Sequence, residues 1–583
     1  MILAIVFLAS SLLLALCSAR KFDSQNHLAY ALPLSIAFSS FALFLSSTFL
    51  GFGQASILVS VALMLACCIP FRKEIKPGLL QKNLVAIAVL SLLFFVWTNH
   101  LMFHYDSLGG VEGFPTDFGF HKSIIASIAN GNFPPQHPLL SGQPLSYYYF
   151  QHLYSAGLVA GGMDLPTASA IPNTFANAAV VLLLFILAGR IMPGKAKGLA
   201  RYFPHAVVIL VLLNGNLSFF NFIQKNGLNF DAITQFSEFT DLKLTAYPVL
   251  NLLSAHLLVT TYAVGLAILL IAAIKILDKE FGKTIVIGLL PLLSLPAFIA
   301  GILMLAFYTL QEEKARKPFA IALAISLPQL AFYALTHGAP AAYLKLGWLS
   351  PAQDPVSIAI FWLQNLGLYA ILGIAGYTIA KNDVKKLLQS TLAPFIAGNI
   401  FIFTPFAWDT GKLFLFFFAM LAVLSATALA RVAEKHRFLA LALLASMILT
   451  GLFSIATVIA NSSTSIYDSF DMQACKWVEQ NTPPNALFLT DGQHTCVFAI
   501  AGRKVFLGDV EWMETHGLDY AKQLQENNAM LAGDCKLIRN KGVGYVYLDG
   551  YGGRHAPVNE TFLRNNAVIA FQQNNRVVYK VNC

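Results

Sequence analysis

Ionisable side chains of the kinds that move protons or hold metal ions are concentrated in one segment, residues 99–147. They include Asp106, Glu112, Asp117 and His121. A carboxylate or an imidazole placed beside a substrate can act as a general base, and both are ligands of divalent metal ions. Their spacing matches no diagnostic metal motif, so solvated loop acids are the alternative interpretation of Asp106 and Glu112.

Asp117 follows a proline and begins a predicted helix over residues 117–130. In that position its carboxylate could simply cap the helix. His121 lies four residues further on, so the two side chains share a helix face. They could bind a metal ion together, form an acid–imidazole pair or be a plain surface pair, and their spacing alone does not decide.

Three consecutive tyrosines end this segment. Tyr147, Tyr148 and Tyr149 stand where a hydrophobic run begins, and His152 follows them closely. Aromatic side chains at a membrane interface are commonly anchors, and contact with a sugar or a phosphate is the functional alternative. His152 is either a core histidine or a ligand.

A second polar group precedes the hydrophobic run 413–430. It contains Trp408, Asp409 and Lys412. Ionisable groups at such a depth cost free energy and tend to be functional, so Lys412 could face a lipid phosphate, or it could form an ion pair with Asp409. Three polar groups inside other hydrophobic runs could line the same cavity or join helices to one another: His256, Gln329 and Asn365.

The elements that must position these residues are membrane spans. The chain of 583 residues is 57% hydrophobic and 11% charged, whereas soluble domains carry about 25% charged residues. Apolar runs of about 15 to 25 residues, the length that crosses a bilayer, are found at 2–18, 28–50, 56–70, 83–98, 148–163, 168–189, 203–218, 252–274, 284–309, 318–335, 355–380, 388–404, 413–430 and 438–460. We therefore predict a polytopic α-helical membrane domain over residues 1–460 with about 12–14 transmembrane helices. Pro291 and Pro296 should divide the run 284–309 into two half-spans.

Basic residues lie in short loops between the runs, at 20–21, 72–73, 195–201, 314–317, 381–386 and 431–437. Such clusters mark cytoplasmic ends and account for the net charge of +9 without nucleic acid. They place residues 99–147, residues 405–412 and everything after residue 460 outside the cytoplasm. The assignment of basic loops to the cytoplasm is inconsistent at one point. If the runs 148–163, 168–189 and 203–218 all cross the membrane, the basic loop at Lys195 lies outside. Either one of these runs does not cross, or the rule fails there.

Residues 461–583 read as a small extracytoplasmic α/β domain of about 120 residues, with alternating helix and strand patterns. Four cysteines, Cys475, Cys496, Cys535 and Cys583, could form two disulfides in any of three connectivities or stay as thiols. Arg503 and Arg554 could meet a phosphate or an acidic acceptor, although exposed arginines usually do neither. We expect this domain to bind an acceptor or a partner and not to carry out chemistry.

The stretch from Glu112 to Leu158 contains Pro115-Thr116-Asp117-Phe118, Pro134-Pro135 and Tyr147-Tyr148-Tyr149-Phe150. It resembles the signature of the archaeal and bacterial "YYY" membrane proteins, and it is similar to the first outer loop of the GT-C glycosyltransferases, which include oligosaccharyltransferases and protein O-mannosyltransferases. The segment 405–412 resembles a Trp-Asp-x-x-Lys motif of similar proteins. The chain departs from the pattern in having no clear Asp-x-Asp in the first loop and no Gly-Asp-x-His-Pro-His segment.

The resemblance implies a GT-C-like fold and transfer of a sugar from a polyprenyl-phosphate donor to a protein, glycan or lipid acceptor at the cell envelope. Asp117 would be the base, assisted by His121. The other candidate residues would contact substrate: Asp106, Glu112, Tyr147, Tyr148, Tyr149, His152, His256, Trp408, Asp409 and Lys412. No cofactor is certain, and a divalent metal held by Asp117 and His121 is compatible with the pattern.

Two other classes compete with this interpretation. A transporter or flippase of a lipid-linked saccharide would show related halves with interrupted spans, and no internal repeat is obvious in the sequence. A non-catalytic membrane scaffold would not need the acids of the first loop.

Overall fold

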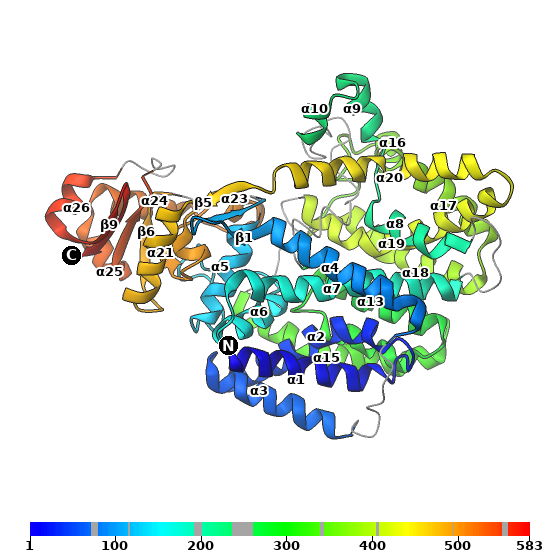
Figure 1. The fold of residues 1–583 in the computed structure, drawn as a ribbon, viewed down its shortest axis with the longest axis horizontal. Helices are drawn as coiled ribbons and strands as arrows, with labels where there is room; N and C mark the ends of the chain where they lie inside the picture. Colours follow the sequence, from blue (N-terminus) through cyan, green and yellow to red (C-terminus); the bar gives the residue numbers. More distant parts are fainter. Residues whose placement is uncertain are drawn as a thin grey trace.

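The computed structural model describes residues 1–70, 80–114, 117–191, 201–235, 261–337, 343–403, 407–492, 494–550 and 558–583. Most of the chain is a bundle of helices that run along the long axis of the molecule, and an α/β domain lies at one end (Figure 1). We call this end of the bundle the domain end and the opposite end the basic end.

Among the described residues, seven helical segments are long and apolar enough to cross a bilayer. They are α1 (Ile2–Ala19), α2 (His27–Leu50), α4 (Lys82–Met102), α7 (Leu165–Ile191), α15 (Arg316–His337, with the span beginning at Glu313), α19 (Ala407–Lys435) and α20 (Arg437–Ala460). An eighth results if α16 (Pro355–Leu366) and α17 (Leu368–Ile379), bent by 84°, are one broken span. The chain is thus a multi-pass membrane protein.

This number covers only the described residues and is lower than the 12–14 predicted. Four apolar helices have 10–17 residues: α3 (Gln54–Cys68), α8 (Phe203–Leu212), α13 (Tyr262–Leu277) and α14 (Leu295–Thr309). The predicted division at Pro291 and Pro296 is confirmed, since η4 (Phe281–Leu289) and α14 are separate elements. The other helices of this part are α9 (Ser218–Asn226), α10 (Phe230–Thr234) and α18 (Asn382–Ile400).

The run 148–163 does not form a span. It contains α6 (Phe150–Ala160), a helix of 11 residues whose side chains are nearly all buried. The backbone of Phe150 binds two neighbours, accepting from Ser40 Oγ at 2.8 Å and donating to Leu292 O at 2.8 Å. With α6 inside the bundle, the charge conflict at Lys195 disappears, because α4 and α7 become consecutive spans.

Ion pairs at the basic end agree with this topology. Arg190 at the end of α7 lies 2.8 Å from Asp278 and 3.8 Å from Asp23, which follows α1. Lys275 of α13, almost fully buried, donates to Asp278, Glu280 and the carbonyl of Phe22 at 2.6 to 3.0 Å. The ends of α1, α7 and α13 therefore meet at one end of the bundle.

The C-terminal domain is built on a five-stranded sheet with the order β7-β6-β8-β10-β9. Its strands are β6 (Leu487–Thr490), β7 (Lys504–Val505), β8 (Tyr545–Leu548), β9 (Ala567–Gln573) and β10 (Arg576–Val581); β7, β6 and β8 are parallel. Its helices are α21 (Ser469–Asn481), α22 (Cys496–Ala499), α23 (Val510–Thr515), α24 (Ala521–Ala532), α25 (Cys535–Lys541) and α26 (Glu560–Asn566). Disulfides join Cys475 to Cys496 and Cys535 to Cys583, which is one of the three possible connectivities.

The first loop and the C-terminal domain are joined through their backbones. In the first contact, β1 (Phe103–Tyr105), β2 (Val111–Gly113) and β5 (Thr464–Tyr467) form one antiparallel sheet. In the second, residues 138–141 run beside β7, with Val505 N donating to Pro138 O and Gly508 N donating to Leu139 O. These two contacts fix the loop against the domain and hold the helix that begins at its centre.

Candidate functional site

The centre of the first loop is α5 (Phe118–Ala129), with Asp117 as its N-cap residue and Asn130 as its C-cap. The helix agrees with the range predicted from the sequence. The carboxylate of Asp117 makes no capping hydrogen bond, so the capping role that its position suggested is wrong. Its backbone carbonyl accepts from His121 N at 3.0 Å, and its side chain is half-buried.

His121 faces away from solvent and toward α6. Its Nδ1 lies 2.8 Å from Nε2 of His152, and the two rings are 5.0 Å apart and nearly parallel. Both side chains are buried, so the surface-pair interpretation of His121 is wrong. The pKa of His121 lies well below its usual range, mainly because the side chain is buried. The neighbouring bases oppose its protonation in the same direction, in the order His152, Lys122, Lys412 and His516. A neutral imidazole has one donor and one acceptor nitrogen, which suits the short contact with His152.

The tyrosines continue this cluster. Tyr147 stacks on Tyr148 with 4.3 Å between ring centres, and its ring lies 5.9 Å from each of the rings of His121 and His152. Tyr147, Tyr148 and Tyr149 are all buried within the protein, so the interpretation as membrane-interface anchors is wrong. They belong to the interior of the site.

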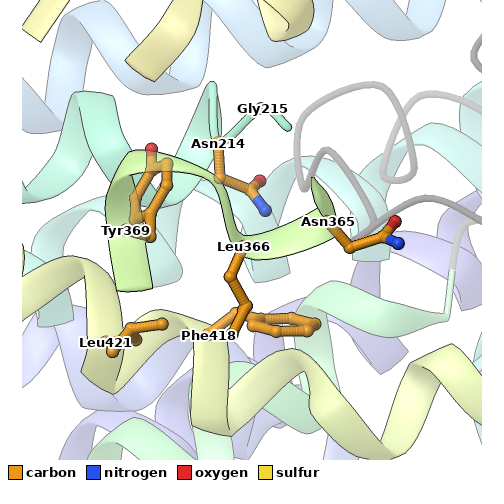
Figure 2. A pocket seen from close by; sticks show the side chains of 7 residues that line it. All are labelled: Asn214, Gly215, Asn365, Leu366, Tyr369, Phe418 and Leu421. Carbon is orange, nitrogen blue, oxygen red and sulfur yellow. The ribbon is translucent and has the colours of Figure 1, made fainter. Parts of the chain in front are cut away.

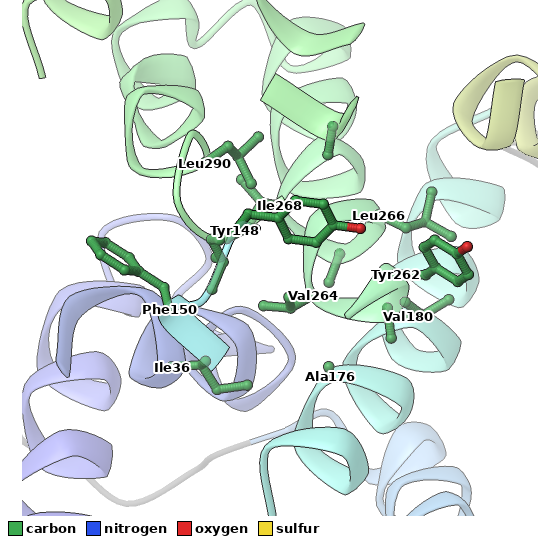
Figure 3. Close-up of a cluster of buried hydrophobic side chains, with 14 of the residues drawn as sticks. Ile36, Tyr148, Phe150, Ala176, Val180, Tyr262, Val264, Leu266, Ile268 and Leu290 are labelled. Carbon is green, nitrogen blue, oxygen red and sulfur yellow. The ribbon is translucent and has the colours of Figure 1, made fainter. Parts of the chain in front are cut away.

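Lys412 of α19 reaches the same place from the other side of the bundle. Its Nζ lies 5.9 Å from the ring centre of Tyr148 and 5.1 Å from that of Tyr262. Tyr148 and Tyr262 stand among apolar side chains around α13 (Figure 3), and the hydroxyl of Thr261 lies 3.5 Å from that of Tyr148. A small cavity with mainly apolar walls begins at Lys412 and Tyr262 and continues along α13, α14 and α19; Leu266, Leu269, Ser294, Ala297, Ala300, Leu415 and Phe416 line the rest.

A further buried base, Lys122, follows His121 on α5. Its Nζ donates to Ser169 Oγ at 2.8 Å and lies 5.0 Å from the ring centre of Phe103. Burial lowers the pKa of Lys122 to about 7. The sequence interpretation did not include Lys122, although a lysine one residue after His121 was visible in the predicted helix.

The C-terminal domain contributes side chains to the other face of α5. Trp512 and His516 lie 5.5 and 5.2 Å from the ring of Phe120, and His516 is 6.1 Å from Tyr147. A Cβ on Gly119 would come within 3.2 Å of Trp512, so glycine permits this close packing. At the far end of α5, Asn130 Nδ2 donates to Ala501 O at 3.1 Å. No local sequence pattern linked residues 494–516 to the loop.

The two remaining acids of the loop lie in its hairpin. Asp106 Oδ1 accepts from Leu108 N and Gly110 N, both at 2.7 Å, and so holds the turn between β1 and β2. Glu112 lies 3.6 Å from His104 across the same pair of strands. Their predicted contact with substrate stays a prediction.

Several predicted residues fall elsewhere. Gln329 binds Leu292 N and Gly288 O, and so joins helices instead of lining the cavity beside Lys412. Asn365 lines a second cavity at the break between α16 and α17, with Asn214 and Tyr369 (Figure 2). His256 and Arg554 lie outside the described residues, as do the side chains of Trp408 and Asp409.

Arg503 is a structural residue and not a phosphate ligand. It is 2% exposed, and its guanidinium donates to Ala501 O, Glu479 O, Thr482 O and Thr482 Oγ1. The suggestion that it could meet a phosphate or an acidic acceptor is wrong, because its buried guanidinium donates to three backbone carbonyls and one threonine hydroxyl of its own domain.

No group of three or more His, Cys, Asp or Glu side chains in the described part of the chain is arranged to hold a metal ion. Asp117 and His121 stay a two-residue candidate, and the ring nitrogen Nδ1 of His121 is already directed at His152. The site is therefore mainly a cluster of bases and aromatic rings, and its residue His121 lies one turn along α5 from Asp117.

No family model and no curated protein matches the sequence. Among solved structures, the apo form of the oligosaccharyltransferase of Archaeoglobus fulgidus is similar, with 13% identity and a TM-score of 0.37 over 80% of this chain and 70% of that one. A likeness at this level of superposition assigns neither a fold nor a function.

Proposed function

We propose that this protein transfers a sugar from a polyprenyl-phosphate donor to an extracytoplasmic acceptor, at the junction of α5, α6 and α19. The observation that carries the proposal is the convergence of three distant segments on one place: α5 with His121, residues 147–152, and Lys412. Basic groups in the helical turn after Asp117, together with Lys412, suit a reaction in which a phosphate leaves and a proton is removed.

The reaction proceeds as a single displacement. The acceptor's nucleophilic atom bonds to the anomeric carbon while the bond between that carbon and the phosphate oxygen breaks, and the electron pair leaves with the polyprenyl phosphate. Asp117 takes the proton from the acceptor. Lys412 faces the leaving phosphate, because opposite charge placed where charge develops stabilises the transition state. Tyr147 and Tyr148 contact the sugar, and the apolar walls beyond Lys412 hold the first part of the polyprenyl chain.

The low pKa of His121 supports the proposal that the phosphate of the donor binds in this cluster. Several bases surround His121, and burial and their positive charges both oppose its protonation. A bound phosphate reverses that balance because it supplies the missing negative charge. The role of Asp117 is supported by its place at the start of the helix that carries His121, one turn before that residue, with its side chain half-buried.

The test is transfer of label by the full chain in lipid nanodiscs. Wild type, Asp117→Asn and Asp534→Asn are incubated with radiolabelled polyprenyl-phosphate hexoses and acceptor extracts. Asp534 is a matched control, because it also stands at a helix N-terminus and its Oδ1 accepts from Leu537 N. We expect transfer by wild type and Asp534→Asn and a loss of about 10²–10⁴-fold in Asp117→Asn, the usual contribution of a general base. Equal transfer by folded Asp117→Asn excludes it as the base.

Transport is the alternative that the same experiment examines. The described residues contain one broken pair of helices, α16 and α17, whereas transporters usually repeat such breaks in two related halves. Label that stays on the lipid across a broad panel of donors, together with movement of the lipid between leaflets, would favour a flippase over the enzyme.

A further inference from the structure

Tripeptides of the form Asn-x-Ser or Asn-x-Thr, with a middle residue other than proline, are the acceptors of N-linked glycans. The chain contains three of them, which begin at Asn216, Asn461 and Asn559. Such a tripeptide also arises by chance, so the sequence alone does not select one. A glycan is bulky and lies on a protein surface, so the surroundings of each asparagine distinguish the three.

The first tripeptide lies inside the helical bundle. Asn216 is 3% exposed, and its Oδ1 accepts from Ser218 N at 2.9 Å. Its backbone carbonyl accepts from Thr450 Oγ1 at 2.8 Å. Because Thr450 stands near the middle of the span α20, a glycan on Asn216 would lie at the depth of the membrane, and this position is excluded.

The second tripeptide begins at the residue that directly follows the span α20. Asn461 Nδ2 donates to Thr457 O at 2.8 Å and to Thr234 O at 3.2 Å. A side-chain amide has two N–H groups, so a sugar in place of either hydrogen breaks a hydrogen bond. Ser462 is 4% exposed, and its Oγ donates to Ile459 O. This tripeptide is therefore bound to the end of α20 and is a poor acceptor.

The third tripeptide lies on the surface of the C-terminal domain. Asn559, Glu560 and Thr561 are all exposed. Asn559 Oδ1 accepts from Phe562 N at 2.9 Å, and in the described part of the chain its Nδ2 makes one hydrogen bond, to Ala532 O at 3.1 Å. An amide that carries a sugar keeps its oxygen and one N–H group, so both contacts can persist. A glycan therefore fits here without a change in the local fold.

Capping of the helix α26 accounts for only part of this tripeptide. An asparagine in front of a helix is common, because its side-chain oxygen accepts from a backbone N–H group. Capping requires no hydroxyl group two residues later. Thr561 is exposed within α26, where threonine is a weaker helix former than alanine, glutamate or lysine. A role as a glycan acceptor explains the asparagine and the threonine together.

The domain is also on the side of the membrane that such a modification needs. It lies at the end of the bundle opposite the basic end (Figure 1), and basic clusters mark cytoplasmic ends. It contains the disulfides Cys475–Cys496 and Cys535–Cys583, and disulfides persist in oxidising compartments outside the cytoplasm. Both observations favour an extracytoplasmic position for Asn559, as an N-linked glycan requires.

We propose that Asn559 is a glycosylation site of this protein, with a saccharide carried on a lipid phosphate as the donor. A bond forms between Asn559 Nδ2 and the anomeric carbon, and the bond between that carbon and the phosphate oxygen breaks. The electron pair leaves with the lipid phosphate, and Nδ2 loses one proton. Any transferase on that side of the membrane can supply the sugar, so the modification does not depend on the activity proposed above for this chain.

Glycopeptide mass spectrometry of the full chain, purified from membranes of its native host, tests the modification. Trypsin releases residues 555–564 as one peptide, because an arginine precedes it and another ends it. We expect this peptide to carry the additional mass of one or more sugar residues, which fragmentation locates on Asn559. The sugar should be lost in Asn559→Gln and in Thr561→Ala. It should be kept in Thr561→Ser, which preserves the tripeptide, and in the matched control Asn461→Gln.

Three results overturn the proposal: an unmodified peptide 555–564 in protein from the native host, a sugar on Asn461 or Asn216 in place of Asn559, or a sugar that persists in Thr561→Ala. Thermal unfolding shows whether each variant is folded. Thr561→Ala retains the amide of Asn559 and its two hydrogen bonds, so this variant decides alone if Asn559→Gln does not fold.

Discussion

Each end of the helical bundle contains a buried lysine, but the surroundings of the two lysines differ. At the basic end, Lys275 lies within 3.0 Å of Asp278 and Glu280, and Arg190 binds Asp278. At the domain end, Lys122 donates to the hydroxyl of Ser169, and Lys412 lies over the rings of Tyr148 and Tyr262. The first arrangement is a network of ion pairs that joins helices. The second combines bases and aromatic rings, which suits an anionic ligand that carries a sugar.

The comparison separates stability from function. A buried ion pair is costly to break, because the remaining charge stays in the interior without its partner. At the domain end, the contacts described are with a hydroxyl group and aromatic rings, which cost less to remove than an ion pair. Substitutions at the basic end should therefore act on folding, and those at the domain end on binding and transfer.

The largest effect is expected from Lys275→Met. It removes the buried cation shared by Asp278 and Glu280, which keep only the more exposed Arg190 and Lys283, and should lower the free energy of unfolding by about 3 kcal/mol. Denaturant titration in detergent micelles measures this loss. Transfer per folded molecule should not change; if it falls in proportion, the basic end is not merely structural.

Lys412→Met should have the opposite profile. Removing one charge that stabilises a leaving phosphate should reduce transfer by about 10²–10³-fold, with little change in the unfolding midpoint. Single-turnover transfer at saturating donor measures the effect. Wild-type rates in this variant would remove Lys412 from the site and leave the two ends of the bundle alike.

The His121–His152 pair should couple energetically. Replacing either ring by phenylalanine removes the 2.8 Å contact and leaves a buried nitrogen unsatisfied, at a cost of about 1–3 kcal/mol. In the double variant that cost should partly disappear, so a double-mutant cycle should give a coupling energy of about 0.5–3 kcal/mol. Strict additivity would show that the hydrogen bond does not contribute.

The remaining prediction concerns pH. Burial lowers the pKa of Lys122 to about 7 in the folded protein, whereas an unfolded lysine titrates near about 10.4. Between these values the unfolded chain binds more protons, so the stability contribution of Lys122 rises as pH increases from about 7 and is unfavourable below it. Unfolding midpoints across this range should show a positive slope that Lys122→Met reduces.

Local sequence patterns predicted those parts of the fold that depend on residues close together in the chain. The prolines at 291 and 296 divide a run, the helix after Asp117 forms where expected, and the strands of the C-terminal domain follow the alternating segments. Hydropathy could not distinguish α6 from a span, because a short helix buried on all sides is as apolar as one that crosses the bilayer. Burial by the bundle, and not lipid, explains its composition.

The site was only partly predictable for a related reason. Asp117, His121, Tyr147, Tyr148 and Lys412 were selected from two segments of the sequence, and the structure brings His121, Tyr147, Tyr148 and Lys412 together. Trp512 and His516 were missed, since their approach depends on backbone pairing between residues 138–141 and 505–508. Contacts between such distant segments leave no periodicity in either one.

The most direct test of the account is to locate the phosphate of the donor. A polyprenyl phosphate with a photoreactive group beside its phosphate is irradiated with the full chain in nanodiscs, and the labelled peptides are identified by mass spectrometry. We predict label in the peptides that contain Tyr147 and Lys412, reduced in Lys412→Met and unchanged in Lys275→Met. Label confined to the peptides around Lys275, or spread equally over both ends of the bundle, would contradict a phosphate site at the junction of α5, α6 and α19.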